Sequence, residues 1–216
     1  MDNNNWVAHF AKKPAMTKSD ILEWKHEERV FFSHVEQQLT ERRRILEAGC
    51  GPACRMIAFC IEYDVTALMI DRSHDIIRMT MQNRDSVGAH GILCEILDFF
   101  ALQDHFQAGE FDVVTHHGVL EHYEPDEIVQ ILNVQLSIAS SVVFAVPIKS
   151  SFNDHYFQSS AHISRNFWTQ DEWLGDILAG FDVTASETVR TNKDELIVSI
   201  KGDKTPRRQS SRRNSL

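Results

Sequence analysis

RILEAGCGPA, residues 44–53, is the stretch that decides the fold of this chain. Its first four residues form a short, mostly apolar run of the kind that makes a buried strand. Gly49 and Gly51 follow, and they allow the backbone to turn tightly and to approach a ligand, because neither carries a Cβ. Residues 56–61 then have the character of a helix. The free N–H groups at the start of such a helix favour a carboxylate or a phosphate.

The alternation of strand and helix continues to residue 147. Because the strands are nearly continuous in apolar residues, we expect a parallel sheet that is covered on both faces. Two alternating segments near the end predict an antiparallel pair. The fold class is therefore α/β, a doubly wound, mostly parallel seven-stranded sheet with an antiparallel last strand and helices on both faces. The further strands are expected at 65–70, 91–96, 111–115, 141–146, 181–189 and 195–200.

The 216 residues are expected to form one domain between a lead-in and a tail. Residues 1–17 are predicted to be irregular, and residues 203–216 to be a basic, disordered tail. The domain itself spans residues 18–202. Within it we expect an amphipathic helix at 18–40, capped by Thr17 or Ser19, a ligand-binding core at 43–147, and a substrate-side loop with the final strands at 148–202.

Composition limits the classes of partner. The net charge of −9 disfavours a general nucleic-acid-binding surface. No signal peptide and no apolar run of about 18 residues is apparent, so we expect no membrane contact. The four cysteines, at 50, 54, 60 and 94, show no disulfide framework. A reducing compartment, the cytoplasm, is the simplest location.

Acidic residues end the second and third predicted strands, and ligands of open parallel sheets bind beyond such ends. Asp71 lies 24 residues after Glu47, and its carboxylate is suited to accept both hydroxyls of a ribose. It is equally suited to cap the next helix. Asp98, beside Phe99, is suited to an adenine. Glu95 is an alternative to Asp98, because the end of that strand is uncertain by a few residues.

The fourth predicted strand ends in a histidine-rich segment, Thr115-His116-His117-Gly118-Val119-Leu120-Glu121-His122. Its spacing fits no helical pair of zinc ligands, and no cysteine is near in sequence, so we expect no metal site. A dinucleotide fingerprint would need a glycine at position 54, where the chain has Cys54. This disfavours an NAD-linked reductase.

The glycine turn, Asp71, Asp98, FDVV at 111–114 and GVLEH at 118–122 occur in one order along the chain. In this order the chain resembles the class I S-adenosylmethionine-dependent methyltransferases over roughly residues 43–147. One departure is Ala53, where many members have a third glycine. No Asn-Pro-Pro-Tyr-type motif follows the fourth strand, which disfavours a nucleic-acid base N-methylase.

The resemblance implies that the cofactor is S-adenosyl-L-methionine, and it assigns roles to residues of this chain. The ribose is expected at Asp71 and Arg72, and the adenine at Asp98 and Phe99. The segment near the reacting sulfonium would be Thr115, His116 and His117. Surrounding the methionine part would be Glu47, Ala48, Gly49, Cys50 and Gly51.

The predicted function is methyl transfer to an O or N, possibly C, nucleophile of a small-molecule acceptor. If the acceptor must lose a proton, the candidate bases are His117, His122 and His155. Two alternatives stay open: an NAD-linked reductase on a similar sheet, and a methyltransferase-like protein that binds cofactor or a partner without turnover. An aromatic lid or pocket wall is expected from Phe152, Tyr156, Phe157 and Trp168.

Overall fold

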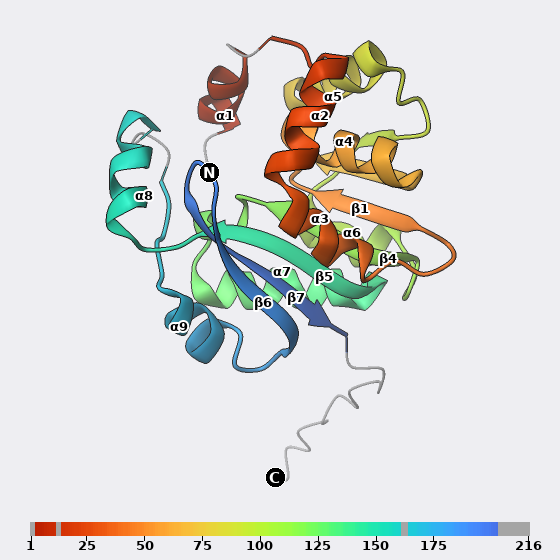
Figure 1. The fold of residues 1–216 in the computed structure, drawn as a ribbon. Helices are drawn as coiled ribbons and strands as arrows, with labels where there is room; N and C mark the ends of the chain where they lie inside the picture. Colours follow the sequence, from red (N-terminus) through yellow and green to blue (C-terminus); the bar gives the residue numbers. More distant parts are fainter. Residues whose placement is uncertain (1–2, 12–13, 161–163, 203–216) are drawn as a thin grey trace.

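The computed structural model describes residues 3–11, 14–160 and 164–202. A seven-stranded sheet runs through the centre in the order β3-β2-β1-β4-β5-β7-β6 (Figure 1). β7 alone runs antiparallel to its neighbours, which confirms the predicted fold class. The strands are β1 (Arg44–Ala48), β2 (Thr66–Asp71), β3 (Leu93–Ile96), β4 (Phe111–His117), β5 (Ala139–Pro147), β6 (Asp182–Arg190) and β7 (Asp194–Lys201).

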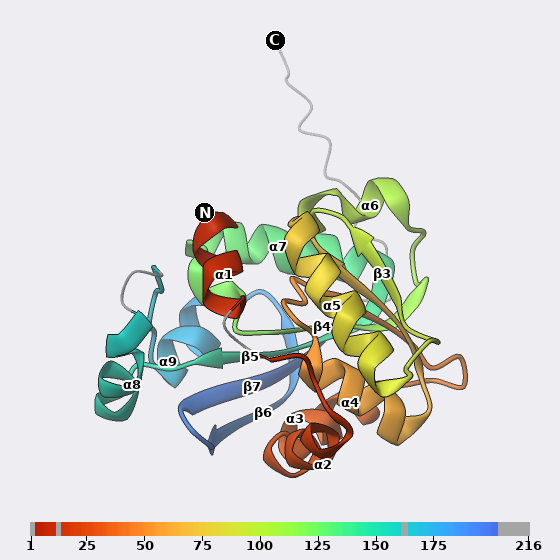
Figure 2. The same ribbon diagram turned by 90° about the horizontal axis from the view of Figure 1, so that it is seen from above.

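Helices cover both faces of the sheet, as Figure 2 shows from above. The helices are α1 (Asn3–Phe10), α2 (Lys18–Glu27), α3 (Arg29–Glu36), α4 (Cys54–Tyr63), α5 (His74–Val87), α6 (Leu102–His105), α7 (Pro125–Ile138), α8 (Ser151–Tyr156) and α9 (Gln170–Glu172), the last continued by a π-helical turn, η4 (Trp173–Ile177).

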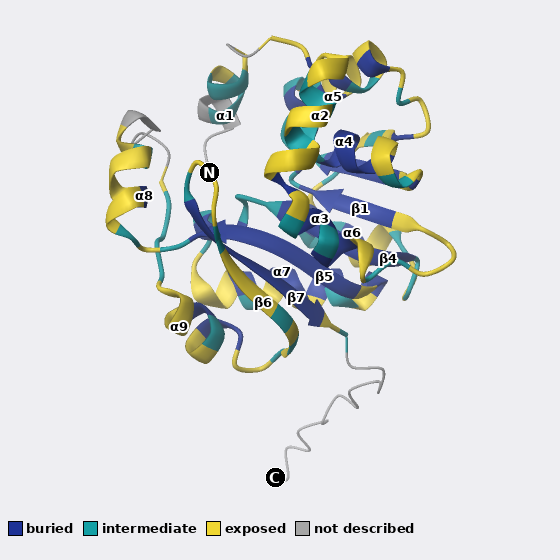
Figure 3. Ribbon diagram, viewed as in Figure 1, coloured by how far each residue is buried: buried dark blue, intermediate teal, exposed yellow. Residues whose placement is uncertain are grey.

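Neighbouring residues of the central strands belong to two separate cores, because successive side chains of a strand point to opposite faces. Ile45 and Val113 pack with α3 and α4 on one face. Leu46 and Val114 pack with α7 and η4 on the other. The central strands are accordingly buried along almost their whole length (Figure 3). This double burial explains why their sequences are continuous in apolar residues.

The N-terminal part differs from its prediction in two ways. The lead-in is not irregular throughout, because residues 3–10 form α1, in which Trp6 and Phe10 stack one turn apart at 5.6 Å. The helix expected at 18–40 is two helices, α2 and α3, which meet at Glu28. Thr17 caps α2 together with Asp20. The predicted tail, 203–216, lies outside the described residues.

None of the helices in the described part of the chain has the length and apolar character needed to cross a membrane.

Candidate functional site

The glycine turn joins β1 to α4 through three left-handed residues. Gly49, Gly51 and Ala53 have φ of 67°, 53° and 55°. A Cβ on Gly49 would lie 3.2 Å from Cγ2 of Val119, so this glycine is needed both for its φ and for space. The N–H of Cys50 donates to the carbonyl of Ile70 at 2.9 Å and fixes the turn against β2. Ala53 adopts the left-handed conformation without the freedom of a glycine.

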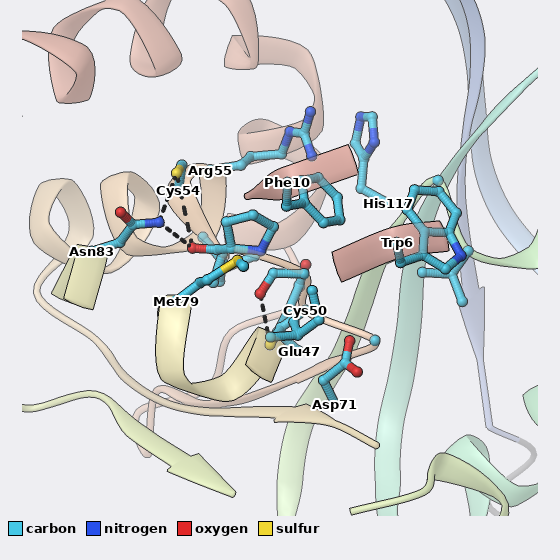
Figure 4. Close-up of a pocket in the computed structure, with 18 of the residues that line it drawn as sticks. Trp6, Phe10, Glu47, Cys50, Cys54, Arg55, Asp71, Met79, Asn83 and His117 are labelled. Carbon is cyan, nitrogen blue, oxygen red and sulfur yellow. Dashed lines mark hydrogen bonds between the residues drawn. The ribbon is translucent and has the colours of Figure 1, made fainter. Parts of the chain in front are cut away.

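A cavity of about 650 Å³ opens at the carboxyl ends of the parallel strands, beside this turn (Figure 4). It lies where β1 and β4 are neighbours in the sheet. From this point the chain runs outward to β2 and β3 on one side and to β5 on the other, and open α/β sheets bind ligands at such a switch in strand order. Ten of the predicted site residues line it: Glu47, Gly49, Cys50, Gly51, Asp71, Arg72, Asp98, Phe99, His117 and His122.

The two acids predicted for ribose and adenine both line this cavity. Asp71 ends β2 and accepts a hydrogen bond from the N–H of Ser73 at 2.9 Å. Burial raises the pKa of Asp71, although the backbone N–H groups of Ser73 and Gly51 act in the opposite direction. Asp98 accepts from the N–H of Phe100 at 2.9 Å. Asp98 is therefore the acid at this strand end that lines the cavity, whereas Glu95 does not.

An aromatic cluster stands beside Asp98. The rings of Phe99 and Tyr123 meet edge to face at 5.6 Å, and Phe100 packs against both. Phe99 and Tyr123 line the cavity together with Leu97. An apolar wall next to a carboxylate suits a flat heteroaromatic ring that bears an amino group. Tyr123 was missed by sequence reasoning, although it follows directly on the GVLEH motif.

Glu47 is buried at the floor of the cavity, with only 5% of its surface exposed. The hydroxyl of Thr115 donates a hydrogen bond to its Oε2. Burial raises the pKa of Glu47 to about 7, because its effect outweighs the lowering by this hydrogen bond and by the charge of Arg55. Thr115 therefore holds Glu47 in place from beneath.

Four predicted site residues do not line the cavity: Ala48, Thr115, His116 and His155. Ala48 packs into the core on the α7 face. His116 is fully buried and stacks on Phe144 at 5.4 Å, and burial lowers its pKa to about 3. Alternation along β1 and β4 explains both placements, since Ala48 and His116 point to the face opposite Glu47 and Thr115. His155 is exposed on α8.

His117 belongs to a buried ion cluster, which we define as Glu28, Arg55, His117, Lys193 and Glu195. Nε2 of His117 lies 3.2 Å from Oε1 of Glu195 and 3.6 Å from Oε2 of Glu28. Arg55 lies 2.7 Å from Glu28, and Lys193 lies 2.7 Å from Glu195. Burial lowers the pKa of His117 well below its ordinary value, and the charges of Arg55 and Lys193 add to this effect. The imidazole is therefore neutral at pH 7.

His122 is held by the loop after α8 and by α1. Its Nδ1 lies 2.6 Å from the carbonyl oxygen of Ser164, and its ring meets Trp6 edge to face at 5.0 Å. The guanidinium of Arg165 lies over both Trp6, at 6.0 Å, and Phe157, at 4.5 Å. The loop thus contacts α1 next to the cavity.

The aromatic wall of the cavity is not the one that the sequence predicted. Trp6, Phe10 and Trp24 line it, from α1 and α2 (Figure 4 labels the first two). The expected wall lies elsewhere: Phe152 stacks under Arg190, Tyr156 meets Phe157 at 4.9 Å, Phe157 packs on Phe167, and Trp168 packs on Trp173. The spacing of Trp6 and Phe10, one helical turn apart, was the available signal for α1.

No group of three or more histidine, cysteine, aspartate or glutamate side chains within 3–11, 14–160 and 164–202 is arranged to hold a metal ion.

Of the comparisons with known proteins, the one with solved structures shows the fold. No family model matches the sequence, and no curated protein matches it. Among solved structures, the chain is similar to magnesium protoporphyrin IX methyltransferase from Synechocystis PCC 6803 with bound SAH, at 16% identity over 93% of this chain and 94% of that chain, with a TM-score of 0.66. It is also similar to the PH0226 protein from Pyrococcus horikoshii OT3, at 15% identity over 91% and 99%, with a TM-score of 0.68.

A third similar structure is geranyl diphosphate methyltransferase in complex with GPP and sinefungin, at 9% identity over 83% of this chain and 77% of that chain, with a TM-score of 0.64. At such low identities the likeness shows the fold. The fold that the resemblance implied, that of the class I S-adenosylmethionine-dependent methyltransferases, is confirmed.

Proposed function

We propose that this chain, with its class I methyltransferase fold, binds S-adenosyl-L-methionine and transfers the methyl group to a small-molecule acceptor. One observation carries the proposal. The glycine turn and the acids Asp71 and Asp98, which are far apart in sequence, line one cavity at the carboxyl edge of the sheet. Its volume of about 650 Å³ is within the usual range for small-molecule sites.

We assign the cofactor to this carboxyl edge of the sheet. We assign its adenine to Asp98, Phe99 and Tyr123, where a carboxylate adjoins an aromatic wall. The ribose hydroxyls are assigned to Asp71, with Arg72 beside them. The methionine part lies against the residues of the glycine turn, in which the two glycines carry no Cβ: Glu47, Gly49, Cys50 and Gly51.

When bound, the cofactor supplies an activated methyl group, and the protein positions the acceptor and excludes water. Trp6 and Phe10 cover the cavity from α1 and help to exclude water. The acceptor atom is an O or N, possibly C, nucleophile. Of the candidate bases, His117 and His122 line the cavity, and His117 is neutral, as a base must be before it accepts a proton.

Calorimetric titration with S-adenosylmethionine, S-adenosylhomocysteine and NADH tests the cofactor. We expect the first two to bind, and binding of NADH alone would overturn the proposal in favour of a reductase. Transfer of a labelled methyl group to extracted metabolites tests turnover. Cofactor binding without transfer to any pool would favour a binding protein of the same fold. The cytoplasm is the proposed location, supported by the four cysteines, all of which are free thiols.

A further inference from the structure

We propose that α1 is a lid over the cofactor site, and that Arg165 holds this lid shut from outside the cavity. The proposal rests on the proposed function, because α1 covers the part of the cavity that we assign to the methionine part of the cofactor. Three observations carry it: the position of α1 over the glycine turn, an anchor of the chain at Met16, and a contact of α1 with the loop after α8.

The helix α1 lies over the glycine turn. Cζ and Cε2 of Phe10 lie 3.5 and 3.6 Å from the position that a Cβ on Gly51 would take, so the ring contacts the turn directly. Trp6, one helical turn earlier, stacks on Phe10 with 17° between the ring planes, and both rings line the cavity (Figure 4). A cofactor whose methionine part lies against this turn is enclosed by α1, and it enters or leaves when α1 moves away.

The chain is fastened to the body of the protein at Met16, between α1 and α2. Met16 is buried, with 4% of its surface exposed. Its N–H donates to Oδ1 of Asn83 at 2.8 Å, and its carbonyl accepts from the hydroxyl of Ser86 at 2.6 Å. Both partners belong to α5, which packs on β2 and β3. The five residues between α1 and Met16 can reach at most about 17 Å, so α1 can leave the turn while Met16 stays in place.

The contact that holds α1 shut is made by the guanidinium of Arg165. It lies over the ring of Trp6 at 6.0 Å and over the ring of Phe157 at 4.5 Å, and electron-rich ring faces attract cations. Arg165 does not line the cavity. It therefore acts on the cofactor only through the position of α1.

The residues on either side of Arg165 are fixed to the short helical turn after β4. The carbonyl of Ser164 accepts a hydrogen bond from Nδ1 of His122 at 2.6 Å. The N–H of Asn166 donates to the carbonyl of Glu121 at 2.6 Å. Arg165 is thus presented to α1 from a part of the chain that is attached to the sheet and stays in place when α1 moves.

This arrangement predicts how a change at Arg165 affects the cofactor. A lid that is shut for most of the time slows binding and release by the same factor, because both wait for it to open. Weakening the contact that holds it shut therefore raises both rates and leaves the dissociation constant nearly unchanged. A residue that only stabilises the site would instead change the dissociation constant.

Surface plasmon resonance on the immobilised full chain, with S-adenosylhomocysteine as the probe, measures both rates. In Arg165→Gln we expect the association and dissociation rates to rise together by about twofold to fivefold, the factor that corresponds to one cation–π contact. Trp6→Ala removes the other partner of this contact, and both rates should rise by at least as much. Trp6→Phe keeps a ring for the guanidinium and should stay close to the parent rates.

The matched control is Arg190→Gln, which removes an arginine that lies over Phe152 at 5.0 Å and does not line the cavity. It should leave both rates unchanged. Unchanged rates in Arg165→Gln, or a weaker affinity with an unchanged association rate, would overturn the proposal. If Arg165→Gln does not fold, as judged by urea unfolding, equal rates in Trp6→Ala and Trp6→Phe overturn it. Failure of S-adenosylhomocysteine to bind the parent chain overturns the proposed function as well, so the two failures are distinguished.

Discussion

The two ends of the cavity are built in different ways. The end that we assign to the adenosyl group is made by residues at the ends of β1, β2 and β3, and parallel strands bring such residues to one edge of the sheet. The other end is lined by α1 and α2, which precede the sheet in sequence and reach the cavity only by docking onto it. The first end is thus fixed by topology, and the second by tertiary contacts such as Glu28 with Arg55. We therefore expect that substitutions at one end change properties that substitutions at the other end leave unaffected.

The largest expected effect concerns the docking of α2. Glu28, between α2 and α3, is 7% exposed and pairs with Arg55 of α4 at 2.7 Å. Glu28→Ala leaves the guanidinium of Arg55 without its nearest carboxylate. Breaking a buried pair costs about 3–5 kcal/mol, and we expect the lower end because the Arg55 side chain keeps 23% of its exposure. Urea unfolding measures the free energy of unfolding.

The neighbouring acid Glu27 is the control for this prediction. It is exposed and unpaired among the described residues, so Glu27→Ala should change the free energy of unfolding by less than about 0.5 kcal/mol. Equal stability of the Glu28 and Glu27 variants would mean that the ion pair does not hold α2 against α4.

The next effect concerns the adenosyl end. Asp71→Ala is expected to weaken binding of S-adenosylhomocysteine by about 1–3 kcal/mol, the cost of removing a partner from buried polar groups. Titration calorimetry gives the dissociation constant. Asp75→Ala is the control, because Asp75 is half-exposed on α5 and pairs with Arg78 outside the cavity. An unchanged dissociation constant for Asp71→Ala would remove this residue from the site.

The difference between the two ends also explains which parts of the site could be predicted from the sequence. Asp71 and Asp98 were located without a structure because strand order alone brings them together. The same alternation of a strand that places Glu47 at the cavity turns Ala48 away, and the register of β4 turns His116 into the core. A shift of one residue along a strand moves a side chain to the opposite face of the sheet. A glycine motif does not specify which residues of the strand point to the cavity.

The aromatic wall at the end lined by α1 and α2 was not predicted, because its geometry depends on how helices dock. The amphipathic pattern of 18–40 gave no sign that the helix breaks at Glu28, since the break is stabilised by Arg55, 27 residues further along the chain. Trp6 and Phe10 had a helical spacing, but the cavity they cover is formed by residues much later in the sequence. The aromatic residues of 152–168, which the sequence predicted for the wall, pack instead among themselves, under Arg190 and on η4.

A smaller effect is expected from pH at the floor of the cavity. The pKa of Glu47 is raised to about 7 by burial. A raised carboxyl pKa means that the folded state holds a proton that the unfolded chain has lost, so the contribution to stability falls as the pH rises from about 4.5 to about 7. A cationic cofactor prefers the ionised carboxylate, so its affinity should change in the opposite direction.

We expect S-adenosylmethionine to bind about threefold to tenfold more tightly at about pH 8 than at about pH 6, measured by calorimetry. Glu47→Gln should remove this dependence, because the amide does not titrate. A pH dependence that persists in Glu47→Gln would assign the titration to another group, and Asp71 is the next to examine, since burial raises its pKa as well.

The smallest expected effect separates the predicted bases. His155 is exposed on α8 and does not line the cavity, whereas His122 lines it and is held by Trp6 and Ser164. His155→Ala should therefore leave kcat/KM for methyl transfer within about twofold of the parent, and His122→Ala should lower it by more, because only His122 lines the cavity. A large loss in His155→Ala would require α8 to approach the cavity during turnover. The contact of Arg165 with both Trp6 and Phe157 is the connection through which such a movement would reach α1.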